Sequence, residues 1–231
     1  MRRRSIFALI FILTSFLLSG GTALALLLHH VPTFYRDNSI GEGSRRASQA
    51  HECERRAQEV WNTMENGLPW EQQFYQCEIN SYFQQEASRT IGGLLELPEA
   101  VHDVRIAFDN DLIRVGFRYG QGQWSTIISV EFRVWLVAKK PNVVALELCS
   151  FRAGAIPLGT QVLLDYVSEQ ARQFNIDVTW YRNHGHPVAL LQFQANQPRP
   201  TILLSRLEVQ AGQLKVGGRR PSESGQPAPG D

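Results

Sequence analysis

The chain has 231 residues, of which 43% are apolar and 19% charged, and its formal net charge is +1 at pH 7. This composition is typical of a globular chain with a hydrophobic core and excludes a disordered protein. The nearly balanced charge lacks the basic excess that nucleic-acid binders usually carry, which excludes a typical protein of that class. Three cysteines are too few for a disulfide-dense mini-protein. The length predicts one domain of ordinary size with room for an N-terminal anchor.

The first thirty residues predict a single membrane anchor. Three arginines at positions 2–4 precede residues 5–28, which carry no charge. As one helix this segment would be about 36 Å long, enough to cross a hydrocarbon core of about 30 Å. The arginines would stay in the cytoplasm, which places the main domain on the outer side of the cytoplasmic membrane. A cleaved signal peptide is the alternative, because Ala23-Leu24-Ala25 has the form of a cleavage site, although residues 26–28 continue the apolar run.

The rest of the chain divides into three segments by composition. We predict a juxtamembrane linker at 31–43 and an extracytoplasmic α+β domain at 44–216. Residues 217–231 contain four glycines and three prolines but no large apolar side chain, which predicts a disordered tail.

Two helices are predicted at the start of this domain. Residues 44–66 are mostly good helix formers without proline, and Ser44 is a candidate N-cap. Residues 70–88 also show apolar positions three and four apart. Cys53 and Cys77 fall on the inner stripes of these helices. They would either form a disulfide outside the cytoplasm or serve as small buried hydrophobic residues.

From Val101 onward the apolar period changes to two, which is typical of strands. Residues 101–119 predict a hairpin around the turn residues Asp109-Asn110-Asp111. Residues 124–136 and 143–151 predict two further strands. The clean alternation along successive strands favours an antiparallel sheet with one solvated face.

A third helix and more strands follow. Thr160 is a good N-cap for a helix that would end near residue 175. Strands are then predicted at 176–181, 188–194 and 202–209, with a short one at 213–216. Because four strands precede this helix, the alternation of a doubly wound fold is absent. The sequence therefore predicts an α+β domain, with helices packed on a long curved antiparallel sheet of about six to seven strands.

No motif for catalysis, phosphate binding or a metal centre is complete. The chain has no nucleophile elbow, phosphate-binding loop or paired-cysteine motif. His184 and His186 would supply two metal ligands, but the spacing points to no third one, and a solvated hairpin loop explains the pair better. We therefore expect no enzyme activity, no cofactor and no bound metal.

The acidic residues on the strands have a structural explanation. Glu131 and Glu147 occupy polar strand faces, where each can meet an arginine such as Arg133 or Arg114 across strands. Cys149 lies on a strand with no basic residue next to it in sequence, which predicts an inert thiol.

The strongest functional signal is the apolar face of the strand at 124–136. This strand would be about 40 Å long, and few helices are available to cover it. An open trough would expose more apolar surface than a monomer usually tolerates, so a helix of the same chain, a lipid chain or a protein partner should cover it. The wall residues that we expect are Ile128, Val130, Phe132, Val134, Leu163 and Val167.

Three short motifs carry a family resemblance. Residues 78–83 (EINSYF) match the helix motif E-[LI]-N-x-[YL]-[LF], residues 104–115 match a hairpin pattern, and residues 154–157 (GAIP) resemble a G-x-x-[IL]-P loop that is one position shorter here. Together they resemble the YpmS-like proteins, bacterial proteins with one N-terminal membrane anchor, over residues 70–216. More distantly, the layout is similar to tubular lipid-binding domains, in which a curved sheet wraps a long helix and leaves an apolar channel.

This resemblance implies binding of lipid or another apolar ligand at the membrane, and it implies no catalytic residue. Helix 44–66 and the segment 180–187 depart from the family pattern, which leaves the ligand open. Two functions remain: a membrane-anchored domain that binds lipid or another apolar ligand, or an envelope scaffold that binds proteins through the charged helix 44–66.

Overall fold

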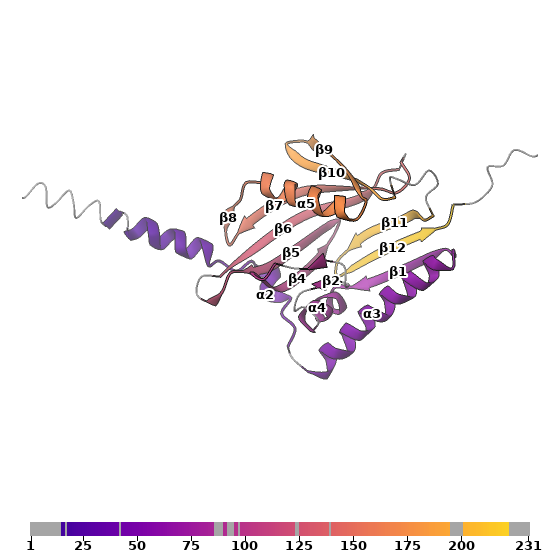
Figure 1. Cartoon of the computed structure of the whole chain (residues 1–231). Helices are drawn as coiled ribbons and strands as arrows, with labels where there is room; N and C mark the ends of the chain where they lie inside the picture. Colours follow the sequence, from indigo (N-terminus) through magenta and orange to yellow (C-terminus); the bar gives the residue numbers. More distant parts are fainter. Residues whose placement is uncertain are drawn as a thin grey trace, which may run out of the picture.

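The computed structural model describes residues 15–16, 18–41, 43–85, 90–91, 95–96, 98–122, 125–138, 140–194 and 201–221. Residues 18–28 are helical, and this N-terminal helix extends away from the body of the molecule (Figure 1). Within the described residues, no helix combines the length and the apolar character that a membrane crossing needs. Residues 1–14 and 17 of the predicted anchor lie outside the described residues.

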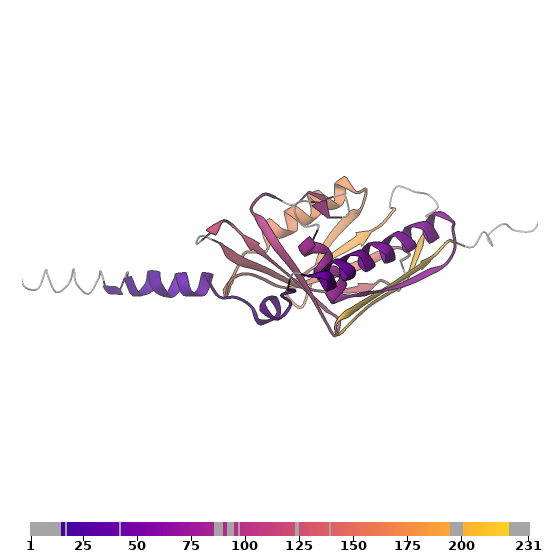
Figure 2. The same ribbon diagram turned by 90° about the horizontal axis from the view of Figure 1, so that it is seen from below.

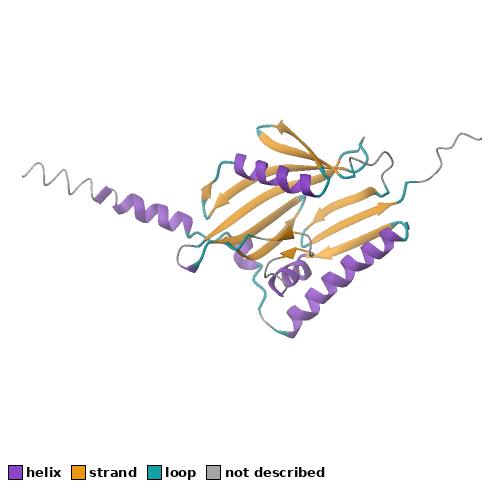
Figure 3. Cartoon of the chain, in the orientation of Figure 1, coloured by secondary structure: helices purple, strands orange, loops and turns teal. Residues whose placement is uncertain are grey.

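A seven-stranded antiparallel sheet forms the centre of the molecule (Figure 3). Its members are β4 (Val101–Asp109), β5 (Leu112–Tyr119), β6 (Thr126–Leu136), β7 (Val143–Ala153), β8 (Ile156–Pro157), β9 (Asp177–Asn183) and β10 (His186–Gln192). The strand order is β4-β5-β6-β7-β10-β9, and β8 pairs with the end of β7. The predicted α+β fold with a long antiparallel sheet is confirmed.

A second, three-stranded sheet was not expected. It has the order β1-β12-β11 and consists of β1 (Trp70–Tyr75), β12 (Gln213–Arg219) and β11 (Leu203–Gln210). The prediction of one helix over 70–88 is therefore wrong in its first part, and α4 (Gln76–Gln85) begins only after β1. The cause is non-local, because Trp70 pairs with Gly218 at the other end of the chain. The short strands β2 (Thr90–Ile91) and β3 (Leu95–Glu96) pair with each other.

Three helices lie on one side of the sheets. Viewed from below, the two sheets diverge like the arms of a V, with α3 (Ser44–Glu65), α4 and α5 (Gln161–Gln173) on the inner side (Figure 2). The short α2 (Thr33–Asp37) lies on the outer side. The helices predicted at 44–66 and 160–175 are confirmed, and Thr160 occupies the predicted N-cap position of α5, whereas Ser44 is the first helical residue of α3 and not its cap. Gly43 precedes α3, and the Thr160 side chain makes no capping hydrogen bond.

The core lies where the two sheets and α4 meet. Phe108 of β4, Ile113 of β5 and Val209 of β11 are its buried centre. Partly buried side chains from α4, the main sheet and β12 pack around them: Ile79, Ile106, Val115, Phe132, Val134 and Leu214.

Side chains of α4 close the free edge of β4. Asn80, which is 1% exposed, donates from Nδ2 to the carbonyl of Ile106 at 2.8 Å and accepts from the Ile106 N–H at 2.7 Å. Gln76 accepts from the Phe108 N–H at 2.7 Å, and the Gly212 N–H donates to the Phe108 carbonyl at 3.0 Å. An edge strand left bare is a site for unwanted strand pairing, so these bonds both satisfy and protect the edge.

The described cysteines are all free thiols. Cys53 is buried on α3, whereas Cys77 is exposed at the start of α4. The disulfide alternative is therefore not seen, and the buried-hydrophobe alternative holds for Cys53 alone. Cys77 leaves the inner stripe because the helix on which it was placed begins six residues later than predicted.

Candidate functional site

The four predicted wall residues of β6 lie on one face of the strand, because its pairing with β5 continues without a break. Phe132 and Val134 pack against the core around Phe108. Ile128 and Val130 lie further toward the start of the strand. All four are only partly buried, although β6 is an interior strand of the sheet.

The opposite face of β6 is covered more completely. Ile127 and Ser129 are 2% and 5% exposed. Ser129 pairs with Gly116, and a Cβ atom at Gly116 would lie 2.7 Å from the ring of Tyr35. The face expected to be solvated is therefore covered near these residues, because α2 packs against it.

The two wall residues predicted on the helix lie on α5. Leu163 and Val167 are partly buried there, and α5 packs mainly on β9, where the Trp180 Nε1 donates to Ser168 Oγ at 2.8 Å. Val162 on the same helix is 75% exposed. The structure thus brings four wall residues together on β6 and places the other two on a helix whose main contact is the edge strand β9.

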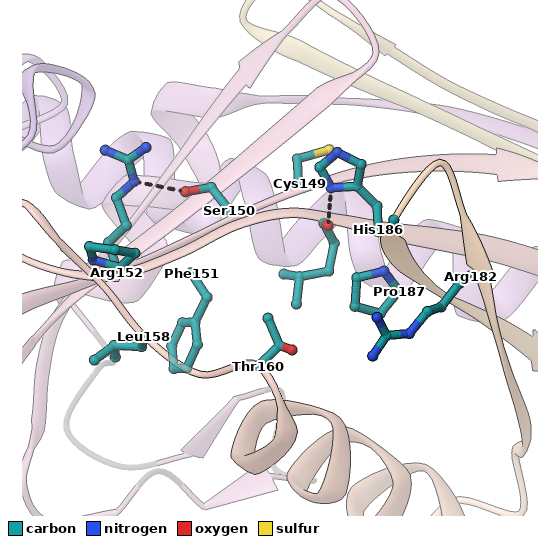
Figure 4. A pocket seen from close by; sticks show the side chains of 12 residues that line it. Cys149, Ser150, Phe151, Arg152, Leu158, Thr160, Arg182, His186 and Pro187 are labelled. Carbon is teal, nitrogen blue, oxygen red and sulfur yellow. Dashed lines mark hydrogen bonds between the residues drawn. The ribbon is translucent and has the colours of Figure 1, made fainter.

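A cavity of about 300 Å³ opens at a gap along β7 (Figure 4). Along one edge of β7, β10 pairs with it only as far as Glu147, and β8 pairs with it only from Arg152 onward. Residues 148–151 of β7 therefore have no strand partner along this edge. The lining residues are Leu148, Cys149, Ser150, Phe151, Arg152, Pro157, Leu158, Thr160, Arg182, Gly185, His186 and Pro187. None of the six predicted wall residues is among them.

This cavity has basic groups but no acidic lining residue. Arg152, Arg182 and His186 contribute to it. No sequence signal marks the pair of arginines, since 30 residues separate them and only the β7–β10–β9 arrangement brings them to one cavity. His186 donates from Nδ1 to the Leu148 carbonyl at 3.2 Å, which occupies one polar group of the gap.

Cys149 lies at the irregularity in β7, where the pairing with β6 shifts. Burial raises the pKa of its thiol, with the nearby Arg133 acting in the opposite direction. A raised pKa lowers the thiolate fraction at neutral pH, which agrees with the inert thiol that the sequence predicts.

Glu131 and Glu147 form the cross-strand ion pairs that the sequence predicts, and His184 lies in a turn. Glu131 lies 3.3 Å from Arg114, and Glu147 lies 3.3 Å from Arg133. His184 adopts a positive φ of 48° in the tight turn between β9 and β10. Among the described residues no group of three or more His, Cys, Asp or Glu side chains is arranged to hold a metal ion.

The end of the N-terminal helix is attached to the main domain. The Leu27 carbonyl accepts from the Ala155 N–H at 2.8 Å, and the Leu28 carbonyl accepts from the Thr126 hydroxyl at 2.5 Å. A Cβ atom at Gly154 would collide with both carbonyl oxygens. These contacts satisfy carbonyls that a helix end otherwise leaves free. They place the start of β6 and the β7–β8 turn directly against the helix.

A second attachment is made by α2. The Tyr35 hydroxyl donates to the Asp103 carbonyl at 2.7 Å, and Arg105 donates to the Tyr35 carbonyl at 2.7 Å with its guanidinium 4.3 Å from the ring centre. Burial raises the pKa of the Tyr35 phenol, and the Asp103 carboxylate adds to this rise. Residues 33–37 of the segment expected to be a linker therefore form a short helix that packs on the sheet.

The polar residues of the segment 78–83 are structural. Glu78 is buried, and its Oε2 lies 3.2 Å from the Arg56 Nε. The two groups form an ion pair, but their angles are not those of a hydrogen bond. Burial raises the pKa of Glu78, while Arg56 opposes the rise. Arg56 also donates to the Gln73 carbonyl of β1 at 3.2 Å. Glu78 and Asn80 thus hold α3, α4 and the sheets together.

No protein-family model, curated protein or solved structure matches this chain. The resemblance to YpmS-like proteins and tubular lipid-binding domains therefore stays a prediction, and the function is inferred from the geometry.

Proposed function

We propose that this chain is a non-enzymatic, membrane-anchored domain that binds a lipid or another apolar molecule on the inner side of its main sheet. The observation that carries the proposal is the incomplete cover of β6. Val130 lies on an interior strand and faces the helices, yet it is partly exposed, while Ile127 on the other face is 2% exposed. Burial of apolar surface gains about 25 cal/mol per Å², which favours an apolar occupant there.

The attachment of the N-terminal helix supports a location at the membrane. With residues 1–30 as the anchor, the bonds from Leu27 and Leu28 to the main domain would hold that domain close to the membrane surface. A ligand taken from the bilayer would then have a short path to the sheet. The main domain would lie outside the cytoplasm, following the arginines at the N-terminus.

The envelope-scaffold function is the second candidate. The observation in its favour is Trp61, which is 60% exposed near the end of α3. The inner stripe of α3 is already used within the chain, because Ala50 and Cys53 are buried and Arg56 contacts both β1 and α4. A protein partner would therefore have to bind the outer surface of this helix, which places the scaffold second.

Native mass spectrometry of the full chain, released from non-ionic detergent micelles after purification from membranes, tests the lipid proposal. We expect a co-purified adduct of lipid mass in the wild type, lost in Val130→Asp because a charge in an apolar site is costly. The matched control is Leu68→Asp, which places the same charge at a side chain that is 58% exposed in a loop.

A second variant covers the case in which Val130→Asp does not fold. Val130→Phe keeps the site apolar but reduces the space beside β6, so it should weaken the adduct while the unfolding transition persists. A folded wild type without any lipid adduct would refute the proposal, as would undiminished adducts in both folded variants.

A further inference from the structure

The cavity beside β7 has an apolar wall and a polar end on the side of α5. Leu158 and Phe151 lie on one side of it and Arg182 on the other, with Thr160 between them near the start of α5 (Figure 4), and Leu148 also lines it. At about 300 Å³ it is at the lower end of the size of known ligand sites, which is about 300–1,000 Å³. Its chemistry is that of an amphiphile site, with a cation next to an apolar surface.

No acidic side chain among the described residues neutralises the positive charge of this cavity. In the described part of the structure neither Arg182 nor Arg152 forms an ion pair, and none of the lining residues is acidic. Arg152 lies on the other side of β7, where its Nε donates to Ser150 Oγ at 3.1 Å (Figure 4). Arg182 is therefore the guanidinium available at the end near Thr160. A guanidinium binds phosphate and carboxylate oxygens through paired hydrogen bonds.

The cavity also lies close to the attached helix end. The β7–β8 turn that binds the Leu27 carbonyl consists of Gly154 and Ala155, and the cavity-lining residues Arg152 and Pro157 are two residues away on either side. With the anchor in the bilayer, the cavity would open near the level of the lipid headgroups. The abundant amphiphile at that level is a membrane phospholipid.

From the charge, the apolar wall and this position, we infer that the cavity binds the phosphate group of an anionic phospholipid, with Arg182 contacting the phosphate and Phe151 lying beside the acyl region. The inference rests on the proposed function and adds to it a headgroup site and a selectivity. The trough beside Val130 would hold apolar chains whatever their headgroup, whereas this cavity favours phospholipids of net negative charge over neutral zwitterions.

The experiment is a competition on the full chain. The protein is placed in mixed micelles of non-ionic detergent with equal amounts of dioleoyl phosphatidic acid and dioleoyl phosphatidylcholine, and native mass spectrometry counts each bound lipid. We expect the wild type to favour phosphatidic acid by about tenfold, the effect of one charge-assisted contact. Arg182→Gln should remove this preference while the protein stays folded.

Arg152→Gln is the matched control, because it removes the same charge from a residue of the same cavity that points to the other side of β7. It should leave the preference within about twofold of the wild type. Equal losses in both arginine variants would overturn the contact and indicate a long-range charge effect. Equal binding of the two lipids by the wild type would also overturn it.

A competition with inorganic phosphate distinguishes a site for a lipid headgroup from a site for free phosphate. If millimolar phosphate displaces phosphatidic acid and binds equally well without lipid, the site is for free phosphate and the lipid inference is wrong. The two proposals fail in different ways. The proposed function fails if Val130→Asp keeps its lipid adducts, whereas the headgroup inference fails if the wild type binds lipid without selectivity.

Discussion

Asn80 should be among the most costly residues to replace, because it closes the free edge of β4. Its side chain satisfies both the N–H and the carbonyl of Ile106 while being 1% exposed. Asn80→Ala removes two hydrogen bonds and leaves two buried backbone groups unpaired, each costing about 1–3 kcal/mol. We therefore expect a loss of about 2–5 kcal/mol, a large share of the roughly 5–15 kcal/mol that stabilises a typical domain.

Urea unfolding of the full chain in non-ionic detergent, followed by tryptophan fluorescence, measures this loss. Asn80→Asp is the more specific variant, since it keeps the shape but turns the donor to the Ile106 carbonyl into a negatively charged acceptor. It should be destabilised strongly at neutral pH and partly recover in acid, where the protonated carboxyl can donate again. The control Asn66→Ala loses an exposed bond to the Asn62 carbonyl and should change stability by less than about 0.5 kcal/mol. If Asn80→Ala cost less than about 1 kcal/mol, the edge-capping argument would be wrong.

Three further predictions follow from packing and charge. Gly116→Val would drive a side chain into the ring of Tyr35 and should cost about 1–3 kcal/mol in the same urea assay, whereas Gly41→Ala, with open space around it, should be neutral. Burial raises the pKa of Cys53 to about 11, so this thiol should react with iodoacetamide far more slowly than the exposed Cys77. Mass spectrometry would follow the labelling at pH 8, about half a unit below the usual thiol pKa. Burial raises the pKa of Glu78 above 4.5, so the native state keeps this proton to a higher pH than the unfolded state does. The free energy of unfolding should therefore fall as the pH rises from 4.5 through the raised pKa, and Glu78→Gln should flatten that slope.

The sequence predicts those elements whose signals are local. The alternation of apolar residues from Val101 finds the hairpin of β4 and β5, and the helix formers of residues 44–66 find α3 within one residue at its end. The ion pairs of Glu131 and Glu147 follow from the same alternation, because polar residues on one face of adjacent strands are close by geometry.

The features missed depend on partners far along the chain. β1 is a strand because Trp70 and its neighbours pair with β12, about 140 residues later, and helical spacing within residues 70–88 cannot reveal that. The cavity forms where the pairing of β10 and β8 with β7 leaves a gap, and the attachment of Leu27 depends on the backbone of Ala155. Every residue has the same backbone groups, and the sequence does not mark where the pairing of two strands ends. The cavity and the attachment of the helix end could therefore not be predicted from the sequence.

The buried polar residues narrow the search for function. Asn80 caps β4, Asn142 binds the backbone of Ile202 and Leu204 before and within β11, and Glu78 pairs with Arg56. Polar side chains engaged in this way hold elements together and are not free for a ligand or for proton transfer. Among the described residues, the partly exposed apolar face of β6 and the cationic cavity beside β7 have no such structural task. Both lie on the main sheet, the first on β6 and the second between β7 and β9, and together they fit a molecule with a long apolar part and one anionic group, which is why both proposals lead to the same class of ligand.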